Sequence, residues 1–225
     1  MAEPVLVLRP EPGATRTGEA LGKAGFRPVS YPLYVVETVE WTPPDPAQYD
    51  AVLVTSANAM RLGGPGVSRY CRLPLFAVGE ASARAAQRAG FRDVTTGGGN
   101  APLTLPLIVA AGYSRILHLC GMEVREVDDL GLSITRLPVY GTMPTGDAQG
   151  LAQALPRERE IFALVHSPRA GGRLAELVSP ADRDRITILA ISGAASEACG
   201  EGWHGRVIAG AATDAALLAG LQMLV

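Results

Sequence analysis

Short apolar runs recur along the chain, and each is followed by a turn and then by a small-residue segment with helical spacing. The first run, residues 5–8, leads into an amphipathic stretch that ends at Ala24, where Gly25 supplies a typical helix stop. The other runs are residues 52–54, 75–78, 116–119, 162–165 and 188–191. Continuous apolar runs of this length that alternate with helices are typical of parallel strands covered on both faces. The pattern therefore predicts an α/β fold.

The second half of the chain repeats the first half in the same order. The matched segments are 6–10 with 117–121, 31–34 with 137–140, 53–56 with 164–167, 75–81 with 188–194, and Asn100 with Thr213. A single match of this kind is weak, because small-residue strands look alike. The common order nevertheless indicates an internal duplication, and it predicts two similar lobes, each with its own parallel sheet.

The duplication permits two arrangements of the sheets. Either each half of the chain forms its own lobe, or the opening unit of each half joins the remainder of the other half. In the second arrangement the chain crosses between the lobes twice, in the extended segments near Tyr34 and Tyr140. Both segments carry a proline and β-branched residues, which favour extended backbone. These patterns alone leave both arrangements open.

The composition of the chain argues against several classes of function. The chain of 225 residues is 48% apolar and has a net charge of -2, which gives no support for a nucleic-acid or membrane-surface partner. The cysteines Cys71, Cys120 and Cys199 are odd in number and widely spaced, so they imply neither a disulfide framework nor a zinc site. The first residues do not resemble a signal peptide, and no run of about 20 apolar residues exists. We therefore expect a cytoplasmic protein.

Common catalytic signatures are missing from the sequence. Neither a phosphate-binding P-loop nor a nucleophile elbow occurs, and the scattered histidines suggest no metal site. His118 lies inside an apolar strand, which favours a hydrogen-bonded core histidine. His166 ends a strand and could face a cleft, although a packed position is favoured. Cys120 has no nearby base, so we expect an inert buried thiol.

Small polar turns follow the strands instead. They include Arg9-Pro10, Thr55-Ser56, Gly79-Glu80-Ala81-Ser82, Cys120-Gly121, Ser167-Pro168-Arg169 and Ser192-Gly193. Ligands of open parallel sheets bind at the carboxyl ends of the strands, where helix N-termini attract anions by about 0.3–1 kcal/mol each. The same residue types are ordinary N-caps, worth about 1 kcal/mol of stability each. Together these turns predict an anion-binding surface without a strong base or nucleophile.

These motifs, in this order, resemble the uroporphyrinogen-III synthase family over the whole chain. The resemblance is carried by Val139-Tyr140-Gly141-Thr142, Thr55-Ser56, His166-Ser167-Pro168, Ala77-Val78-Gly79, Leu119-Cys120-Gly121 with Arg125-Glu126, and the ending Ala212-Thr213-Asp214-Ala215-Ala216-Leu217. The sequence departs from the family pattern at Ala57-Asn58, where Pro-Arg is common, and after Met60, where the chain is shortened. These departures bear on how the first serine turn contacts substrate.

The resemblance implies the interleaved arrangement of two flavodoxin-like lobes. Lobe one would comprise residues 1–34 and 143–225, and lobe two residues 38–138. A two-stranded β ladder at 35–37 and 139–142 would connect them, with Tyr34 and Tyr140 in or beside it. The duplication itself predicts that the two lobes face a shared cleft.

The resemblance also implies the activity. The family cyclises hydroxymethylbilane, a linear tetrapyrrole with eight carboxylates, to uroporphyrinogen III, with loss of water and inversion of ring D through a spiro intermediate. It uses neither a metal nor an organic cofactor. Tyr140 is the candidate catalytic acid. The candidate substrate-binding residues are Ser56, Ser82, Ser167, Thr213, Gly79, Asn100, Arg9 and Arg169. We expect a monomer whose partner is this small-molecule polycarboxylate. The alternatives are an inactive synthase-like regulatory protein and a two-lobed small-molecule binding protein.

Overall fold

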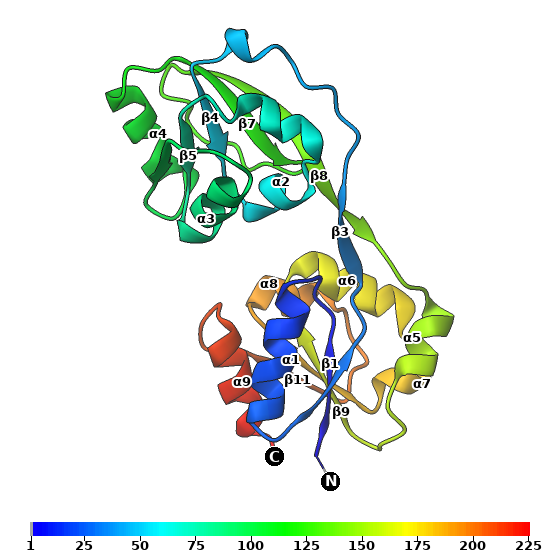
Figure 1. Cartoon of the computed structure of the whole chain (residues 1–225). Helices are drawn as coiled ribbons and strands as arrows, with labels where there is room; N and C mark the ends of the chain where they lie inside the picture. The colour runs from blue at the N-terminus through cyan, green and yellow to red at the C-terminus, as the bar shows by residue number, and fades with distance from the viewer. Residues whose placement is uncertain (1) are drawn as a thin grey trace. The chain divides into compact units, whose positions relative to one another are not determined.

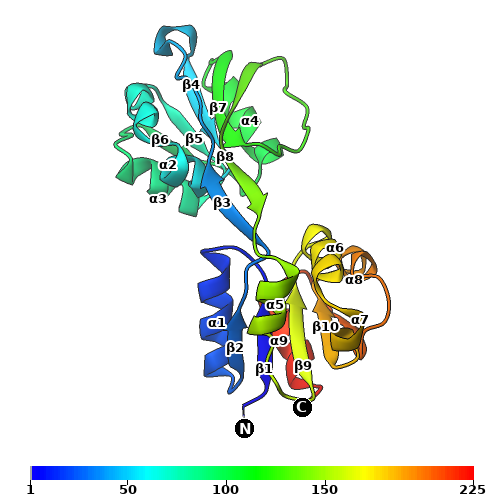
Figure 2. The same ribbon diagram turned by 90° about the vertical axis from the view of Figure 1, so that its right-hand side faces the viewer.

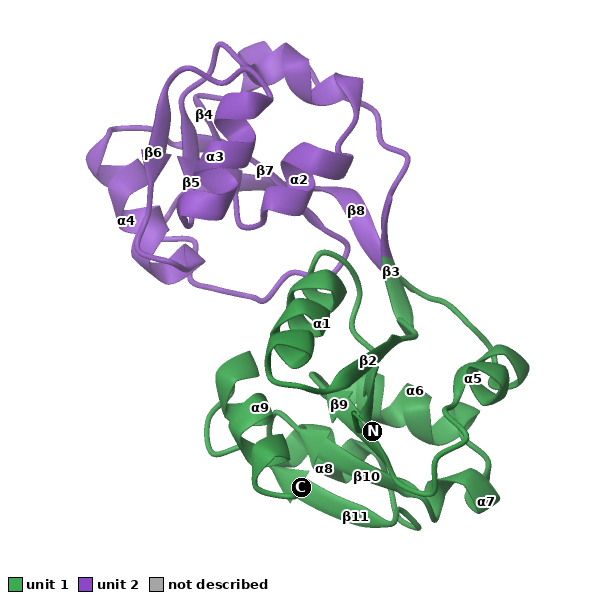
Figure 3. Cartoon of the chain, turned by 60° about the horizontal axis from the view of Figure 1, so that its bottom comes forward, with its two compact units in different colours: residues 1–35, 143–225 green, residues 36–142 purple. Residues whose placement is uncertain are grey.

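The computed structural model describes residues 2–225, and the chain divides into two compact units. Unit 1 comprises residues 1–35 and 143–225, and unit 2 comprises residues 36–142 (Figure 3). The chain therefore leaves unit 1, forms unit 2 and then returns. The sequence-based domain bounds and the connecting ladder stay predictions.

Unit 1 is built on a five-stranded sheet with the order β11-β10-β9-β1-β2 (Figure 1). The strands are β1 (Pro4–Val7), β2 (Arg27–Ser30), β9 (Ile161–Val165), β10 (Ile186–Ala190) and β11 (Gly205–Ile208). Neighbouring strands are parallel. Every residue of the three central strands is buried, as expected for strands covered on both faces.

Helices cover both faces of this sheet (Figure 2). They are α1 (Gly13–Lys23), α5 (Ala148–Ala154), α6 (Pro168–Leu177), α7 (Pro180–Arg183), α8 (Gly193–Ala198) and α9 (Asp214–Gln222). Leu21 of α1 and Leu217 of α9 join the core cluster that contains Val7. On the other face, Leu174 of α6 joins the cluster that contains Leu6. Successive residues of β1 thus supply two different cores.

The predicted end of the first helix is confirmed. Ala24 is the C-cap of α1, and Gly25 follows with φ of +88°, a left-handed conformation that favours glycine.

Unit 2 is built on a six-stranded sheet with the order β3-β8-β7-β4-β5-β6. The strands are β3 (Tyr34–Thr38), β4 (Ala51–Val54), β5 (Leu75–Ala77), β6 (Val94–Thr96), β7 (Arg115–Gly121) and β8 (Ser133–Pro144). The helices are α2 (Ala57–Leu62), α3 (Glu80–Arg88) and α4 (Ala101–Ala110), with 3-10 turns at Pro46–Gln48 and Pro65–Tyr70. The pairs from β8 through β6 are parallel.

The two sheets follow one plan. The sequence repeat matches β7 with β1 and β4 with β9. With this matching, the strand order β6-β5-β4-β7-β8 in unit 2 corresponds to β11-β10-β9-β1-β2 in unit 1. The prediction of an α/β fold with two similar parallel sheets is confirmed. Within residues 2–225, no helix is long and apolar enough to cross a bilayer.

The connection between β7 and β8 departs from this plan. In unit 1 the chain runs from β1 through α1 to β2, which is the usual helical crossover between parallel strands. In unit 2 the chain runs from β7 to β8 through the irregular 122–132 segment. A turn at its end brings the Leu132 N–H to the Asp129 carbonyl at 3.0 Å. The face that α1 covers in unit 1 is therefore covered differently in unit 2.

Candidate active site

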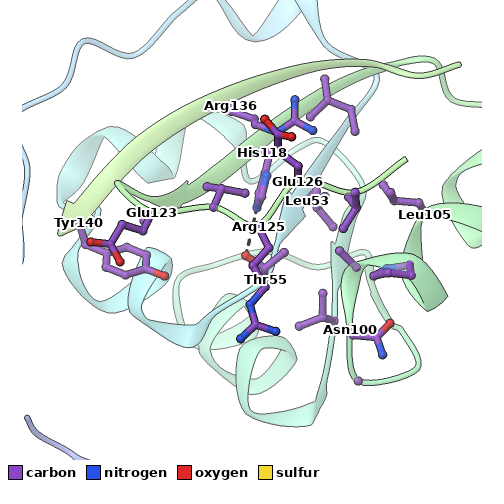
Figure 4. A pocket seen from close by; sticks show the side chains of 18 residues that line it. Leu53, Thr55, Asn100, Leu105, His118, Glu123, Arg125, Glu126, Arg136 and Tyr140 are labelled. Atoms are coloured by element: carbon purple, nitrogen blue, oxygen red, sulfur yellow. Dashed lines mark hydrogen bonds between the residues drawn. The ribbon is translucent and has the colours of Figure 1, made fainter. Parts of the chain in front are cut away.

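A cavity of about 530 Å³ lies in unit 2, at the carboxyl ends of β4 and β7 (Figure 4). Its apolar wall includes Leu53, Leu105 and Ile134. Its polar side chains include Thr55, Asn100, His118, Arg125, Arg136 and Tyr140. An apolar cavity of this size with a few convergent polar groups is typical of a small-molecule site.

His118 forms the buried polar centre of the cavity. Its side chain points from β7 toward β4, and Nε2 lies 3.1 Å from the Thr55 hydroxyl (Figure 4). The residue is 3% exposed. Burial, with a smaller effect of the Arg136 charge, lowers the pKa of His118 to about 4. The imidazole is therefore neutral at pH 7, and the predicted hydrogen-bonded core histidine is confirmed.

Charged side chains surround the mouth of the cavity. Arg136 forms an ion pair with Asp129 at 2.5 Å. The 122–132 segment brings Glu123, Arg125 and Glu126 to the lining. A second cavity, of about 470 Å³, is lined by several of the same residues, including Arg125 and Arg136. The 122–132 segment therefore borders two cavities, whereas the helices on this sheet pack against its core.

Asn100 marks the N-terminus of α4 at this cavity. Its side-chain oxygen accepts a hydrogen bond from the Leu103 N–H at 3.0 Å, so it is a helix N-cap. The first residues of α4, Ala101 and Pro102, line the cavity, so the positive end of the helix dipole lies at the lining. This arrangement favours an anionic group in the cavity.

Tyr140 lies at the edge of the cavity, on β8. Its hydroxyl points toward the middle of the group of lining side chains (Figure 4). The ring also packs against the core cluster that contains Leu119 and Val139. A phenol held in this way presents one donor and acceptor to a ligand in the cavity.

The carboxyl ends of β1 and β9 in unit 1 carry a cluster of charged residues. Arg9 donates to both carboxylate oxygens of Asp214 at 2.8 Å, and the Thr17 hydroxyl lies 3.3 Å from the same carboxylate. The side chain of His166 is 8% exposed, and Nε2 lies 3.4 Å from the carboxylate. Burial, followed by the Arg9 charge, lowers the pKa of His166 to about 4. The Arg9 guanidinium is therefore already paired with a carboxylate of the chain, that of Asp214.

Across residues 2–225, no group of three His, Cys, Asp or Glu side chains is arranged to hold a metal ion. The three cysteines are free thiols, and burial raises the pKa of Cys120 to about 11. That thiol is thus protonated at neutral pH, in agreement with the predicted inert role.

The sequence model of the family described as "Uroporphyrinogen-III synthase HemD" matches residues 15–219. The chain belongs to this family. It is accordingly an enzyme of tetrapyrrole biosynthesis, and an inactive regulatory or binding protein is not favoured. A search of curated proteins finds no match.

A solved structure with a family name shares the fold of this chain. The uroporphyrinogen-III synthetase of Helicobacter pylori 26695 is 18% identical, with a TM-score of 0.68 and 100% of both chains covered. A mutant uroporphyrinogen III synthase from the extremely thermophilic bacterium Thermus thermophilus is 19% identical, with a TM-score of 0.48, over 99% of this chain and 98% of that one. The first of these, with both chains covered in full, supports the fold of the chain.

Five of the binding candidates that the resemblance implies are helix N-caps: Ser56, Gly79, Asn100, Ser167 and Thr213. The side chains of Ser56, Ser167 and Thr213 accept from backbone N–H groups at 3.2 Å, at the starts of α2, α6 and α9. Each residue also lies at the carboxyl edge of its sheet, because α2 follows β4, α6 follows β9 and α9 follows β11. Their capping role is therefore observed, and their contact with substrate stays a prediction.

The other candidates differ in how accessible they are. Gly79 is the N-cap of α3, and a Cβ added there would meet nothing within 4 Å. Ser82 is 5% exposed inside α3, and its N–H donates to the Gly79 carbonyl at 3.0 Å, so its contact with substrate stays a prediction. Arg169 stacks over the Tyr34 ring at 4.8 Å. Of all candidates, Asn100 and Tyr140 line the same cavity.

Several lining residues were not among the sequence candidates. Arg125, Glu123 and Glu126 belong to the 122–132 segment, and Arg136 lies on β8. The Arg125-Glu126 pair within the family motif was an available signal. Asp214, which pairs with Arg9 in unit 1, was not a candidate either. The sequence signal for it is its place in the first turn of a helix, where acidic residues are common.

Proposed function

We propose that the chain cyclises hydroxymethylbilane to uroporphyrinogen III and that the cavity of unit 2 binds part of this substrate. The observation that carries the proposal is the meeting of Tyr140, Asn100 and the neutral Thr55–His118 pair at one cavity. The apolar wall suits a pyrrole ring, and the N-terminus of α4 suits a carboxylate. The matching carboxyl edge of unit 1 would bind further carboxylates through Ser167, Thr213 and their helix N-termini.

Tyr140 would act as the general acid for loss of the substrate hydroxyl. Its phenol proton leaves with that hydroxyl as water, and the substrate becomes an electron-deficient, protonated azafulvene cation beside the phenolate. The substituted carbon of ring D attacks this centre to form the spiro intermediate. The bond from that carbon to the methylene group of ring C then breaks, and the methylene centre bonds to the unsubstituted carbon of ring D. The proton lost from the pyrrole ring in the last step restores the phenol. General acid catalysis of this kind contributes about 10²–10⁴-fold.

Orientation would supply much of the remaining catalysis. The pyrroles of the substrate react without help, and unguided closure gives the symmetric type I isomer. A site that fixes carboxylates at helix N-termini limits the conformations of the linear chain, so that the spiro path becomes the accessible one. No cofactor enters this proposal. It also includes a cytoplasmic monomer that acts on a small molecule and has no nucleic-acid partner.

The role of the cavity can be tested by filling it. Ile134 lines the cavity on β8, whereas Thr135 is its exposed neighbour on the opposite face of the strand. Ile134→Trp should raise KM about 10-fold or more, which corresponds to about 1.4 kcal/mol, and Thr135→Trp should leave KM within about twofold. Equal effects of the two changes on KM would contradict a substrate site in this cavity.

The reaction itself is tested by supplying hydroxymethylbilane to the purified chain and separating the uroporphyrinogen isomers. The proposal predicts the type III isomer, formed faster than spontaneous closure. Formation of the type I isomer alone, at the spontaneous rate, would reject it.

A further inference from the structure

The register between β7 and β8 shifts at the point where Tyr140 enters the site. Cys120 lies opposite Pro138, but Gly121 lies opposite Tyr140, so Val139 is an extra residue of β8. An extra residue of this kind is a β-bulge, and it re-aims the side chains that follow it. Without the bulge, Val139 would lie opposite Gly121. The bulge therefore determines that the tyrosine lies against the glycine.

Gly121 leaves the space that the Tyr140 ring fills. A Cβ added at Gly121 would lie 2.9 Å from Cζ, 3.0 Å from Cε2 and 3.1 Å from the phenol oxygen of Tyr140. The φ angle of Gly121 is outside the left-handed region, unlike that of Gly131 at +79°. The backbone would therefore accept another residue, and the constraint at this position is the tyrosine ring.

The backbone around the ring is held on both sides. The Met122 N–H donates to the Tyr140 carbonyl at 2.9 Å. Val139 is fully buried in the core cluster that contains Leu117 and Leu119. An added methyl group at position 121 would therefore displace the ring more readily than the strand, because the ring has two free torsions and one open side at the cavity.

We propose that Gly121, together with the bulge at Val139, is the positioning device for the Tyr140 phenol. The inference rests on the role proposed above for Tyr140 as general acid. Gly121 lines the same cavity as Tyr140, but it has no side chain that could take part in the reaction. It acts by fixing where the phenol oxygen lies at the edge of the cavity, and its substitution changes the reaction through that oxygen.

The first test compares two Gly→Ala substitutions. Gly121→Ala should lower kcat about 10- to 100-fold, because a misplacement of about 1 Å can cost 10²-fold, while KM changes little. Gly22→Ala in α1 is the matched control, since a Cβ there meets nothing within 4 Å. It should keep wild-type kcat. Equal kcat values for the two variants would overturn the proposal.

A double-mutant cycle separates positioning from general damage. In the Tyr140→Phe background the phenol is absent, so Gly121→Ala should reduce kcat by less than about twofold further, as expected for residues that act as one unit. The same fold-loss in both backgrounds would show that Gly121 acts by another route and would overturn the proposal.

A spectroscopic readout keeps this inference distinct from the function of Tyr140. The ring NMR signals of Tyr140 are assigned by their loss in Tyr140→Phe. They should shift in Gly121→Ala, while the signals of the other tyrosines stay in place. An unshifted Tyr140 signal would overturn the inference. Wild-type turnover in Tyr140→Phe would instead show that Tyr140 is not the general acid. The NMR shift would then still test whether Gly121 fixes the position of the Tyr140 ring.

A loss of folding in Gly121→Ala would also be informative. If the ring is the obstacle, then Tyr140→Ala removes it, and adding Gly121→Ala to that variant should restore a stable fold with the Tm of Tyr140→Ala. Failure of the double variant to fold would contradict the proposed contact.

Discussion

β1 in unit 1 and β7 in unit 2 hold the same place in two sheets of matching order, yet the chain leaves them differently. After β1, helix α1 brings Leu21 onto the sheet and closes the core. After β7, the irregular 122–132 segment adds Val127 as a partly buried contact and borders two cavities. The same framework is closed by a helix in one unit and left open in the other. The comparison shows that the unit without the crossover helix has a cavity beside the matching strand.

Side chains at equivalent places follow the same difference. Val7 of β1 belongs to the apolar core, whereas its counterpart His118 faces the cavity and contacts Thr55. At the carboxyl edge of unit 1, Arg9 is already paired with Asp214. Unit 2 instead presents Tyr140 at an open cavity. We therefore expect the catalytic residue in unit 2. In unit 1, we expect more of the polar residues at the carboxyl edge of the sheet to stabilise the fold.

The largest effect that sharpens this comparison is expected at the duplicated tyrosines. Tyr140→Phe should lower kcat about 10²–10⁴-fold, because a general acid is lost. Its counterpart Tyr34 donates its hydroxyl to the Arg169 carbonyl at 3.2 Å, so Tyr34→Phe should change kcat by less than about threefold, the equivalent of one weak hydrogen bond. Steady-state kinetics with hydroxymethylbilane measures both. Equal losses would erase the functional distinction between the two positions.

The next effect concerns stability. Leu21 is 1% exposed in α1, so Leu21→Ala should lower the free energy of unfolding by about 2–5 kcal/mol. Val127→Ala, in the 122–132 segment, should cost less than about 1 kcal/mol, since the side chain borders cavities. Urea denaturation of both variants provides the measurement. A larger loss for Val127→Ala would mean that the segment packs like a helix.

The two buried histidines predict a loss of stability in acid. The folded-state pKa of His118 and of His166 is lowered to about 4, below the unfolded value of about 6.5. The unfolded chain therefore binds more protons between these values, so the free energy of unfolding is largest above pH 6.5 and falls toward pH 4. Each histidine contributes up to about 3 kcal/mol to this fall.

Urea denaturation at pH 7 and at pH 4.5 measures this dependence. His118→Gln and His166→Gln should each reduce the difference between the two pH values. The exposed His204 is the control, and His204→Gln should leave the difference unchanged. An unchanged difference in all three variants would place the acid sensitivity elsewhere.

The smallest effect compares two helix caps in unit 1. Ser167 and Ser179 each accept a backbone N–H at 3.2 Å, so substitution by alanine should cost about 1 kcal/mol of stability in each case. Ser167 follows β9, whereas Ser179 precedes β10 and lies toward the other edge of the sheet. Only Ser167→Ala should also raise KM, by about two- to tenfold, through a lost hydrogen bond to substrate. A rise in KM for both would point to an indirect effect.

Much of this framework could be predicted from local patterns. The buried strands follow from continuous apolar runs, and the end of α1 follows from Gly25. The caps Ser56, Ser167 and Thr213 follow from polar residues between a strand and a helix. Each of these signals lies within a few residues of the feature that it predicts, and local chain preferences determine the outcome.

The remaining features depend on contacts between distant residues. Asp214 captures Arg9 across 205 positions in the sequence, and no local pattern pairs them. The bulge at Val139 depends on the register of β8 against β7. The missing crossover helix after β7 is not evident from composition, because the 122–132 segment has a mixed polar and apolar sequence. These three features require the assembled sheets.

The most direct test of the central claim is the isomer composition of the product as the enzyme concentration is raised at fixed hydroxymethylbilane. Because catalysed and spontaneous closure compete, the account predicts that the type III fraction rises toward completion with wild-type and Tyr34→Phe enzyme, and much more slowly with Tyr140→Phe. A type III fraction that stays at zero at every wild-type concentration would contradict the account.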